Sequence, residues 1–344
     1  SLIMDTLSQF FGACQQWLFE TLIQPALFHL GMSNFIEDGY DATMWLLVGL
    51  VQIAVLVLVF GPLQRLRPVE AVTDRRQIGI DVLYTLIHRL GVFRLALFFT
   101  IDPFWDSIFG QLHVWGFAPF QLDQYWPGVT DKAWVSLIIY LLLFDAVDYV
   151  YHRAQHRFSW LWALHAVHHS QRQMTIWSDD RNHLLDDMLR DVLVVFVSQL
   201  VGVPPAQFVI VVAITQLAQS FSHANLRMHF GALGERLLVS PRFHRHHHSI
   251  AYDASSPGPV GGYNFAALFP IWDVLFRTAR FGVGYGPTGI HDQRAELGGR
   301  DYGRSFWSQQ WLGIKRMVGR DREPVSAPPS PPGAAERALS LIHI

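Results

Sequence analysis

Residues 133–169 read AWVSLIIYLLLFDAVDYVYHRAQHRFSWLWALHAVHH and combine a long apolar run with clustered histidines. Its first half is an apolar run that carries no charge before Asp145. Its second half spaces histidines three or four residues apart, first His152 and His156, then a run ending at His168 and His169. Residues at these spacings share one face of a helix. The stretch therefore predicts an apolar helix that continues directly into helical segments bearing clustered imidazoles.

Histidine is concentrated in one window, because 12 of the 17 histidines lie between positions 152 and 248. The spacing of the second cluster recurs about eighty residues later, in HRHHH. Several buried imidazoles that converge without a metal would cost free energy. Each ring loses its hydrating water, and protonated neighbours would repel one another. A metal removes both costs. Eight ligands exceed the need of one catalytic metal, so we predict two metals. The predicted catalytic ligands are His152, His156, His165, His168, His169, His244, His247 and His248.

Further residues are candidates for the edge of this site. His183 and His223 are each placed to complete a coordination sphere. Asp148, one helical turn before His152, is predicted to accept a ring N–H from a ligand and fix its tautomer. Asn225, two residues after His223, is a candidate for the same role. A nitrogen-only ligand set suits iron, zinc or copper, and not magnesium or calcium.

The composition indicates a membrane protein. Only 16% of the 344 residues are charged, against about a quarter in a typical soluble domain. Residues 43–60 and 133–151 are long enough to cross most of a hydrocarbon core of about 30 Å. Residues 80–100 form a weaker span interrupted by charges, and Pro204-Pro205 divides residues 192–226 into a helical hairpin. The net charge of −2 gives no sign of nucleic-acid binding, and a lone Cys14 excludes an internal disulfide.

Loop charges predict an orientation. The first 42 residues contain no Lys or Arg, whereas residues 61–79 contain four arginines. The loop at 101–132 contains only Lys132, and basic residues return after position 151. The positive-inside rule then places every histidine cluster on the cytoplasmic side. We predict an all-α, polytopic membrane protein whose cytoplasmic helical cap holds a histidine-rich di-metal site.

Taken in order, five motifs resemble those of the fatty acid hydroxylase and sterol desaturase superfamily, which comprises integral-membrane, non-haem di-iron oxygenases. The motifs are DYVYHRAQHR, LWALHAVHHS, FSHANL, SPRFHRHHH and IWDVLF, and the resemblance runs from about Asp145 to Thr278. It implies that the eight histidines are metal ligands, that His223 matches a further ligand position, and that His183 lies in the family's R-x-H setting. Asn264 matches an Asn-Tyr-Gly motif whose glycine is missing here, and Arg277 stands where many members have Gly.

The resemblance implies O2-dependent hydroxylation or desaturation of a lipid C–H bond at two iron ions, with zinc as a possible substitute. The sequence shows no dinucleotide fingerprint or haem attachment motif, so we expect electrons from a separate reductase with a ferredoxin or cytochrome. The expected organisation is an apolar, interfacial N-terminal segment (1–42), a membrane fatty acid hydroxylase-like domain (43–320) and a disordered Pro-rich tail (321–344).

Three other functions agree less well with the sequence. A histidine-rich metal-binding or transport protein is the main alternative, but transporters place ligands near the bilayer midplane, whereas these follow the spans. A bis-histidine haem protein would leave most of the set idle. A zinc hydrolase normally needs a general-base carboxylate, as in HExxH, and none lies within these motifs.

Overall fold

The computed structural model of the chain describes residues 2–251 and 261–320. Within these residues all regular secondary structure is helical, apart from one isolated bridge between Ser249 and Thr288. The predicted all-α class is confirmed, while the predicted tail at 321–344 lies outside the described residues. The α-helices are α1 (Leu2–Leu18), α2 (Gln24–His29), α3 (Ile36–Val55), α4 (Gly61–Leu66), α5 (Arg75–Arg89), α6 (Val92–Thr100), α7 (Asp102–Val114), α8 (Leu122–Tyr125), α9 (Ala133–Arg157), α10 (Ser159–His169), α11 (Leu184–Val201), α12 (Pro205–Ser222), α13 (Gly231–Leu237), α14 (Pro241–His247), α15 (Ile271–Leu275) and α16 (Phe306–Met317).

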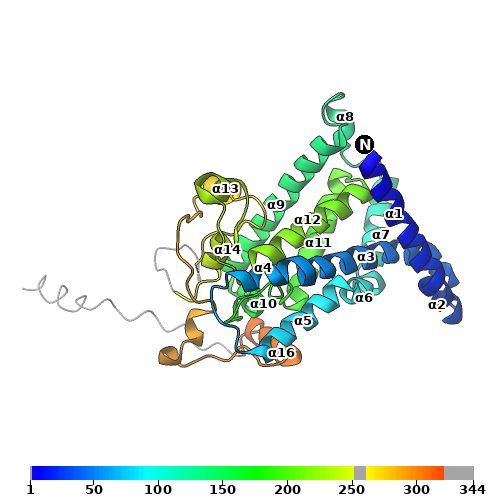
Figure 1. The fold of residues 1–344 in the computed structure, drawn as a ribbon. Helices are drawn as coiled ribbons and strands as arrows, with labels where there is room; N and C mark the ends of the chain where they lie inside the picture. The colour runs from blue at the N-terminus through cyan, green and yellow to red at the C-terminus, as the bar shows by residue number, and fades with distance from the viewer. Residues whose placement is uncertain (1, 252–260, 321–344) are drawn as a thin grey trace, which may run out of the picture.

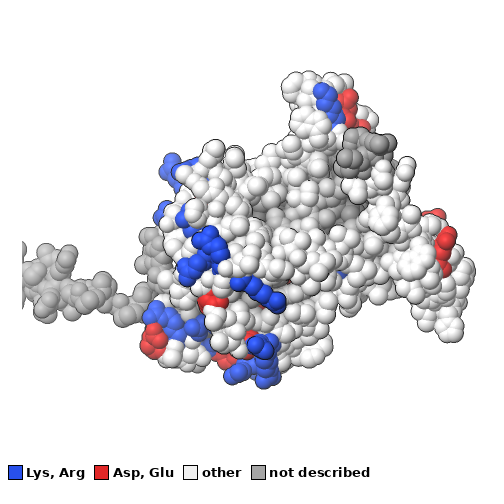
Figure 2. All heavy atoms as spheres, in the orientation of Figure 1, with Lys and Arg blue, Asp and Glu red and all other residues white. Residues whose placement is uncertain are grey.

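Three helical segments are long and apolar enough to cross a membrane: Ser33–Leu66, Ala133–Arg157 and Pro205–Ser222. The first is continuous from a 3-10 turn through α3, a π-helical segment (Leu56–Phe60) and α4. Their outward faces expose large apolar side chains that water would not favour, such as Leu58 at 72% and Val150 at 60%. The face in Figure 2 is almost uncharged over the long helices, and Lys and Arg gather at the end that holds α13, α14 and α16.

The weaker predicted span is broken in the structure. Helices α5 and α6 meet at an angle of 49°, and together they are apolar enough to count as a fourth, bent span. Gly91 lies at the break with φ +79°, a left-handed conformation that glycine adopts without a steric penalty. The predicted hairpin at 192–226 is confirmed as α11 and α12, joined through Gly202 and Pro204.

A close crossing fixes the position of α5 against α3. A Cβ atom on Gly49 would lie 1.7 Å from the carbonyl oxygen of Arg89, so only glycine permits the observed approach. The Arg89 side chain is buried there and donates to Asp179, Asp180, Gln52 and Ser220. This buried ion pair ties α5 to the loop at 170–183 and to α12.

Helices α10, α13, α14 and α16 gather at one end of the long helices and form a cap there (Figure 1). Helix α10 follows α9 after a single residue, Phe158, and packs against α16. Buried hydrogen bonds join this C-terminal helix to the bundle, since Tyr84 of α5 donates to Gln309 at 2.9 Å and accepts from Gln310 at 2.9 Å. The cap therefore encloses the ends of α9 and α12, where the predicted ligands lie.

Candidate metal centre

Nine buried or half-buried histidines converge in two adjacent groups, and the nitrogen atoms within each group lie within 4.8 Å of one another. Helices α9 and α10 contribute most of the first group, and α10, α12 and α14 contribute the second. The two groups touch, because the rings of His169 and His248 stack with centroids 4.4 Å apart. The first group is His152, His156, His165, His169 and His247; the second is His168, His223, His244 and His248.

Local helix geometry explains the convergence. His152 and His156 lie one turn apart at the end of α9, so both rings leave the same face. Both α10 and α14 end at a pair of adjacent histidines. Adjacent residues of a helix point in different directions, so the two members of each pair belong to different groups. His168 joins the second group and His169 the first, and His248 and His247 divide in the same way.

Distances between ring nitrogens suit a shared cation. His169 Nε2 lies 3.1 Å from both His156 Nε2 and His247 Nε2, and His223 Nε2 lies 3.2 Å from His168 Nε2. Metal–nitrogen bonds of about 2.0–2.1 Å place neighbouring ligand atoms about 2.9 Å apart at a right angle and about 3.4 Å apart at a tetrahedral angle. The observed separations fall inside that interval.

The ring tautomers point to the same conclusion. His152, His156 and His247 each place Nδ1 2.7–2.8 Å from a backbone carbonyl, that of Phe265, Gly261 and Tyr263 respectively. A carbonyl oxygen only accepts, so each Nδ1 carries the proton and each Nε2 presents a lone pair.

The Nε2 lone pairs of these rings have too few hydrogen-bond donors within the cluster. One proton on His169 Nε2 satisfies either His156 or His247 and not both. In addition, Nε2 of His152 and of His165 is buried without a hydrogen-bond partner among the described residues. A cation at the centre of each group resolves this arrangement, so the donor set fits a metal pair.

Burial keeps these imidazoles neutral. It lowers the pKa of His168, His169, His244, His247 and His248 well below the ordinary value, and nearby histidines lower each further. Burial also lowers the pKa of His223 to about 4, against the opposing effect of the Gln219 carbonyl that accepts from its Nδ1. At neutral pH these six rings are therefore neutral and available as ligands.

The three orienting carbonyls alternate along one non-helical segment, residues 261–265, which we call the carbonyl strap. Asn264 has φ +61° and pins the strap, because its carboxamide donates to Phe243 and Arg280 carbonyls and accepts from Arg280 N. The buried carboxylate of Asp273 accepts from the next two backbone amides, those of Phe265 and Ala266. In the sequence the strap is marked only by Gly261, Gly262 and Asn264, the three of its residues that have positive φ.

The two departures from the family motif have a clear structural outcome. Arg277 holds φ +59°, the left-handed conformation that explains why glycine is common at this position. Phe265 occupies the position after Asn264, and its ring packs against His152, His156 and His247. Neither substitution interrupts the contacts between strap and ligands.

Three residues predicted at the site have other contacts. His183 lies outside both groups, because its Nδ1 accepts from Leu185 N at the start of α11 and its Nε2 donates to the Gln310 carbonyl. The prediction that Asp148 binds His152 is corrected: Asp148 forms a two-bond ion pair with Arg190, and the strap takes the His152 proton instead.

Asn225 is corrected in the same way. Its carboxamide accepts from the backbone N–H groups of Val69 and Glu70 and donates to the Glu70 carbonyl, not to His223. It thereby fixes the loop that carries Glu70, which pairs with Arg245 of α14. A carboxylate that sequence reasoning missed is closer to a ligand: Asp186 Oδ2 lies 3.4 Å from His165 Nδ1. Asp186 also accepts from Tyr151 and Gln155, each at 2.7 Å.

A cavity of about 250 Å³ opens beside the two groups and extends between the long helices. Five of the clustered histidines line it, together with charged residues of α11 and apolar residues of α3, α9 and α12. A substrate in this cavity would reach both groups. The five histidines are His152, His165, His168, His223 and His244.

Comparisons with known proteins agree with this geometry. The fatty acid hydroxylase family model matches residues 137–278, which include all nine clustered histidines. The ornithine lipid hydroxylase OlsE of Rhizobium tropici is 26% identical over 264 residues, covering 75% of this chain and 74% of that protein. Alkylglycerol monooxygenases of Caenorhabditis elegans and Danio rerio are 28% and 30% identical over 43% of this chain, and the matches span 27% and 31% of those proteins. No solved structure matches the chain.

Proposed function

We propose that the chain is a member of the fatty acid hydroxylase family, whose model matches residues 137–278, and that it binds two iron ions through the nine clustered histidines and hydroxylates a lipid C–H bond with O2. The observation that carries the proposal is the pair of imidazole groups, each with its nitrogens within 4.8 Å, side by side under one cap. Each group would hold one iron. Bound iron supplies the activation of O2 that an unreactive C–H bond requires and that side-chain acid–base groups lack.

The protein's own residues orient and protect this centre. The carbonyl strap holds three ligand rings in the tautomer that presents Nε2, which is how second contacts usually strengthen metal ligation. Asp186 beside His165 is placed to orient a fourth ring. Helix α16 covers α10 from outside, so solvent is kept from the back of the ligands.

The reaction requires a source of electrons. One oxygen atom enters the lipid and the other leaves as water, which consumes two electrons and two protons in each cycle. A single cysteine holds no iron–sulfur cluster, and no dinucleotide fingerprint is present in the sequence. We therefore assign electron delivery to a separate reductase acting through a ferredoxin or cytochrome.

The site's position supports a lipid substrate on the cytoplasmic side. The cavity runs from the histidines into apolar surroundings between candidate membrane helices, where a lipid enters without leaving the bilayer. The distribution of basic residues supports a cytoplasmic cap, because Lys and Arg gather at the end of the molecule that holds it (Figure 2). The matched proteins are by name an ornithine lipid hydroxylase and alkylglycerol monooxygenases, which supports a polar membrane lipid as the substrate.

Growth under 18O2 tests the proposal. Cells that express the wild-type chain should accumulate a lipid with one 18O atom, and cells that express His168→Ala should not, since that variant removes a ligand of the second group. His113→Ala, an exposed position on α7 outside both groups, is the matched control and should behave as wild type. Equal labelling with and without His168 would refute the assignment.

A further inference from the structure

The cavity beside the metal centre is layered along α9. Phe144, Asp148 and His152 line it at successive turns, giving an apolar, a charged and a ligand layer. A rise of about 1.5 Å per residue separates neighbouring layers by about 6 Å along the helix. In the apolar layer the Phe144 ring meets Phe208, which in turn meets Trp45 of α3. The charged layer thus lies between the apolar part of the cavity and the histidines.

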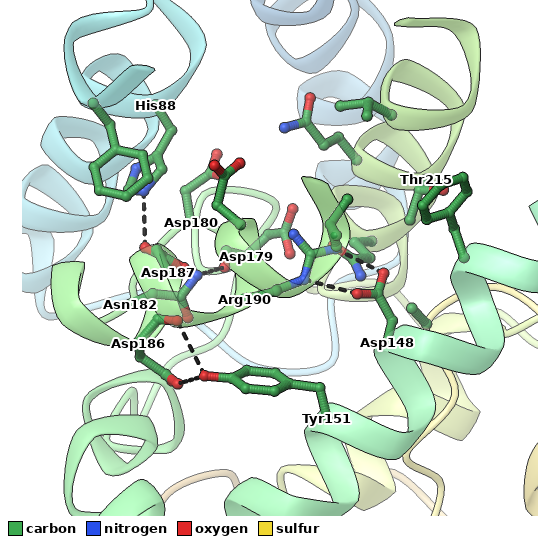
Figure 3. A pocket seen from close by; sticks show the side chains of 18 of the residues that line it. His88, Asp148, Tyr151, Asp179, Asp180, Asn182, Asp186, Asp187, Arg190 and Thr215 are labelled. Carbon is green, nitrogen blue, oxygen red and sulfur yellow. Dashed lines mark hydrogen bonds and ion pairs between the residues drawn. The ribbon is translucent and has the colours of Figure 1, made fainter. Parts of the chain in front are cut away.

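Arg190 of α11 lies in the charged layer and faces Asp148 (Figure 3). Its Nε and Nη2 donate to the two carboxylate oxygens of Asp148 at 2.8 and 2.7 Å. Its Nη1 has no hydrogen-bond partner among residues 2–251 and 261–320. The residue lines the cavity, and 40% of its side chain is exposed. The guanidinium is therefore held by Asp148 while one N–H edge remains available to a ligand.

Other polar groups extend this layer to the ligands. Tyr151 donates to Asp186, which in turn lies against His165. On the far side Asp187 bonds His88 at 2.8 Å. Methylene groups placed among these side chains would remove their water and return no hydrogen bonds, which costs free energy. A polar headgroup would replace that water with direct hydrogen bonds.

Resting on the proposed function, we propose that the charged layer binds the headgroup of the lipid substrate and that Arg190 Nη1 donates to an oxygen acceptor of that headgroup. The acyl chain then lies in the apolar layer near Phe144. The carbon closest to the histidines then belongs to the headgroup. Oxidation breaks a C–H bond there and forms C–OH, with O2 reduced to that hydroxyl and water by the two electrons of the external donor.

Locating the inserted oxygen tests the inference. The chain is expressed in a bacterial host whose membrane contains both phospholipids and ornithine lipids, and the host is grown under 18O2. Tandem mass spectrometry should then find 18O in headgroup fragments. Label in acyl-chain fragments would overturn the headgroup inference and leave the proposed function standing. Absence of label from every lipid would overturn both.

Variants of Arg190 supply a second test. Arg190→Gln should lower headgroup labelling by about ten- to a hundredfold, the loss expected for a hydrogen bond to a charged group, with iron content per chain unchanged. Arg190→Lys keeps the charge beside Asp148 and should recover part of the labelling. The control is Arg242→Gln, which breaks a comparable two-bond pair with Glu235 in the cap away from the cavity, and it should stay within about twofold of wild type. Wild-type labelling by Arg190→Gln, or equal losses in Arg190→Gln and the control, would overturn the role of Arg190.

Discussion

His156 donates its Nδ1 proton to the carbonyl oxygen of Gly261 at 2.8 Å, across 105 residues of sequence. The same arrangement recurs two and four residues further on, with His247 on Tyr263 and His152 on Phe265. Clustered histidines of α9 and α14 are thus aligned by one backbone segment, the carbonyl strap. A metal held by these three rings would be sensitive to small shifts of that segment.

Gly262→Ala should weaken iron binding by about ten- to a hundredfold, the usual effect of losing a contact that orients a ligand. Gly262 has φ +140°, and a Cβ there would lie 3.1 Å from His156 Nδ1 and from the Phe265 ring. The strap must move, and with it the carbonyls on either side. Iron affinity is measured by competition with a chelator. Gly284→Ala, where a Cβ meets nothing within 4 Å, is the control; equal affinities in the two variants would contradict the role of the strap.

Two histidines predicted as further ligands should behave differently. His223→Ala removes a member of the second group and should lower the iron content of the purified protein. His183→Ala should leave iron unchanged and lower stability by about 1–2 kcal/mol, because it removes the bond to Leu185 N at the start of α11 and the bond to the Gln310 carbonyl. Iron analysis and thermal unfolding in detergent separate the two effects. Loss of iron in His183→Ala would restore it as a ligand.

The iron-free protein should lose stability as the pH falls below about 6.5, the ordinary pKa of histidine in the unfolded chain. Burial lowers the pKa of His168, His169, His244, His247 and His248 in the folded protein. The unfolded state therefore binds more protons, and the stability that is present above this pH is lost on acidification. Thermal midpoints of iron-free protein between pH 8 and 5.5 measure the effect. His244→Gln should make the slope shallower, and a flat wild-type profile would count against buried neutral imidazoles.

The crossing of α3 and α5 should tolerate no side chain at Gly49. Gly49→Ala places a Cβ 1.7 Å from the Arg89 carbonyl and should destabilise the protein by about 1–3 kcal/mol or more, since the two backbones must separate. Gly110→Ala, also within a helix but with open space around its Cβ, should be neutral or slightly stabilising. Unfolding midpoints of both variants compare the positions. A wild-type midpoint for Gly49→Ala would show that the helices do not meet as described.

Much of this architecture was predictable from the sequence, because residues three or four apart in a helix share one face. The apolar run before Asp145 and the histidines three and four apart predicted the span, the cap and eight of the nine clustered rings. Pro204-Pro205 likewise predicted the hairpin. The ninth ring, His223, is also a candidate ligand in the sequence although it stands alone there, and its place at the end of α12 brings it beside His168 and His244.

What spacing did not reveal depends on contacts between distant segments. Asp148 was predicted to orient His152 because the two lie one turn apart, yet an arginine 42 residues away pairs with it. The groups that orient the rings of His152, His156 and His247 are backbone carbonyls, which every residue possesses and no sequence pattern marks. Asp186 was missed for a similar reason, since its approach to His165 depends on how α11 packs against α10.

Metal analysis of the purified, iron-reconstituted protein determines whether the two histidine groups bind a pair of irons. We expect two irons per chain, with an X-ray absorption spectrum that shows only nitrogen or oxygen neighbours, and loss of iron when His169→Ala removes the ring that contacts both His156 and His247. An iron content of one or fewer per chain, or full retention of iron by His169→Ala, would contradict this expectation.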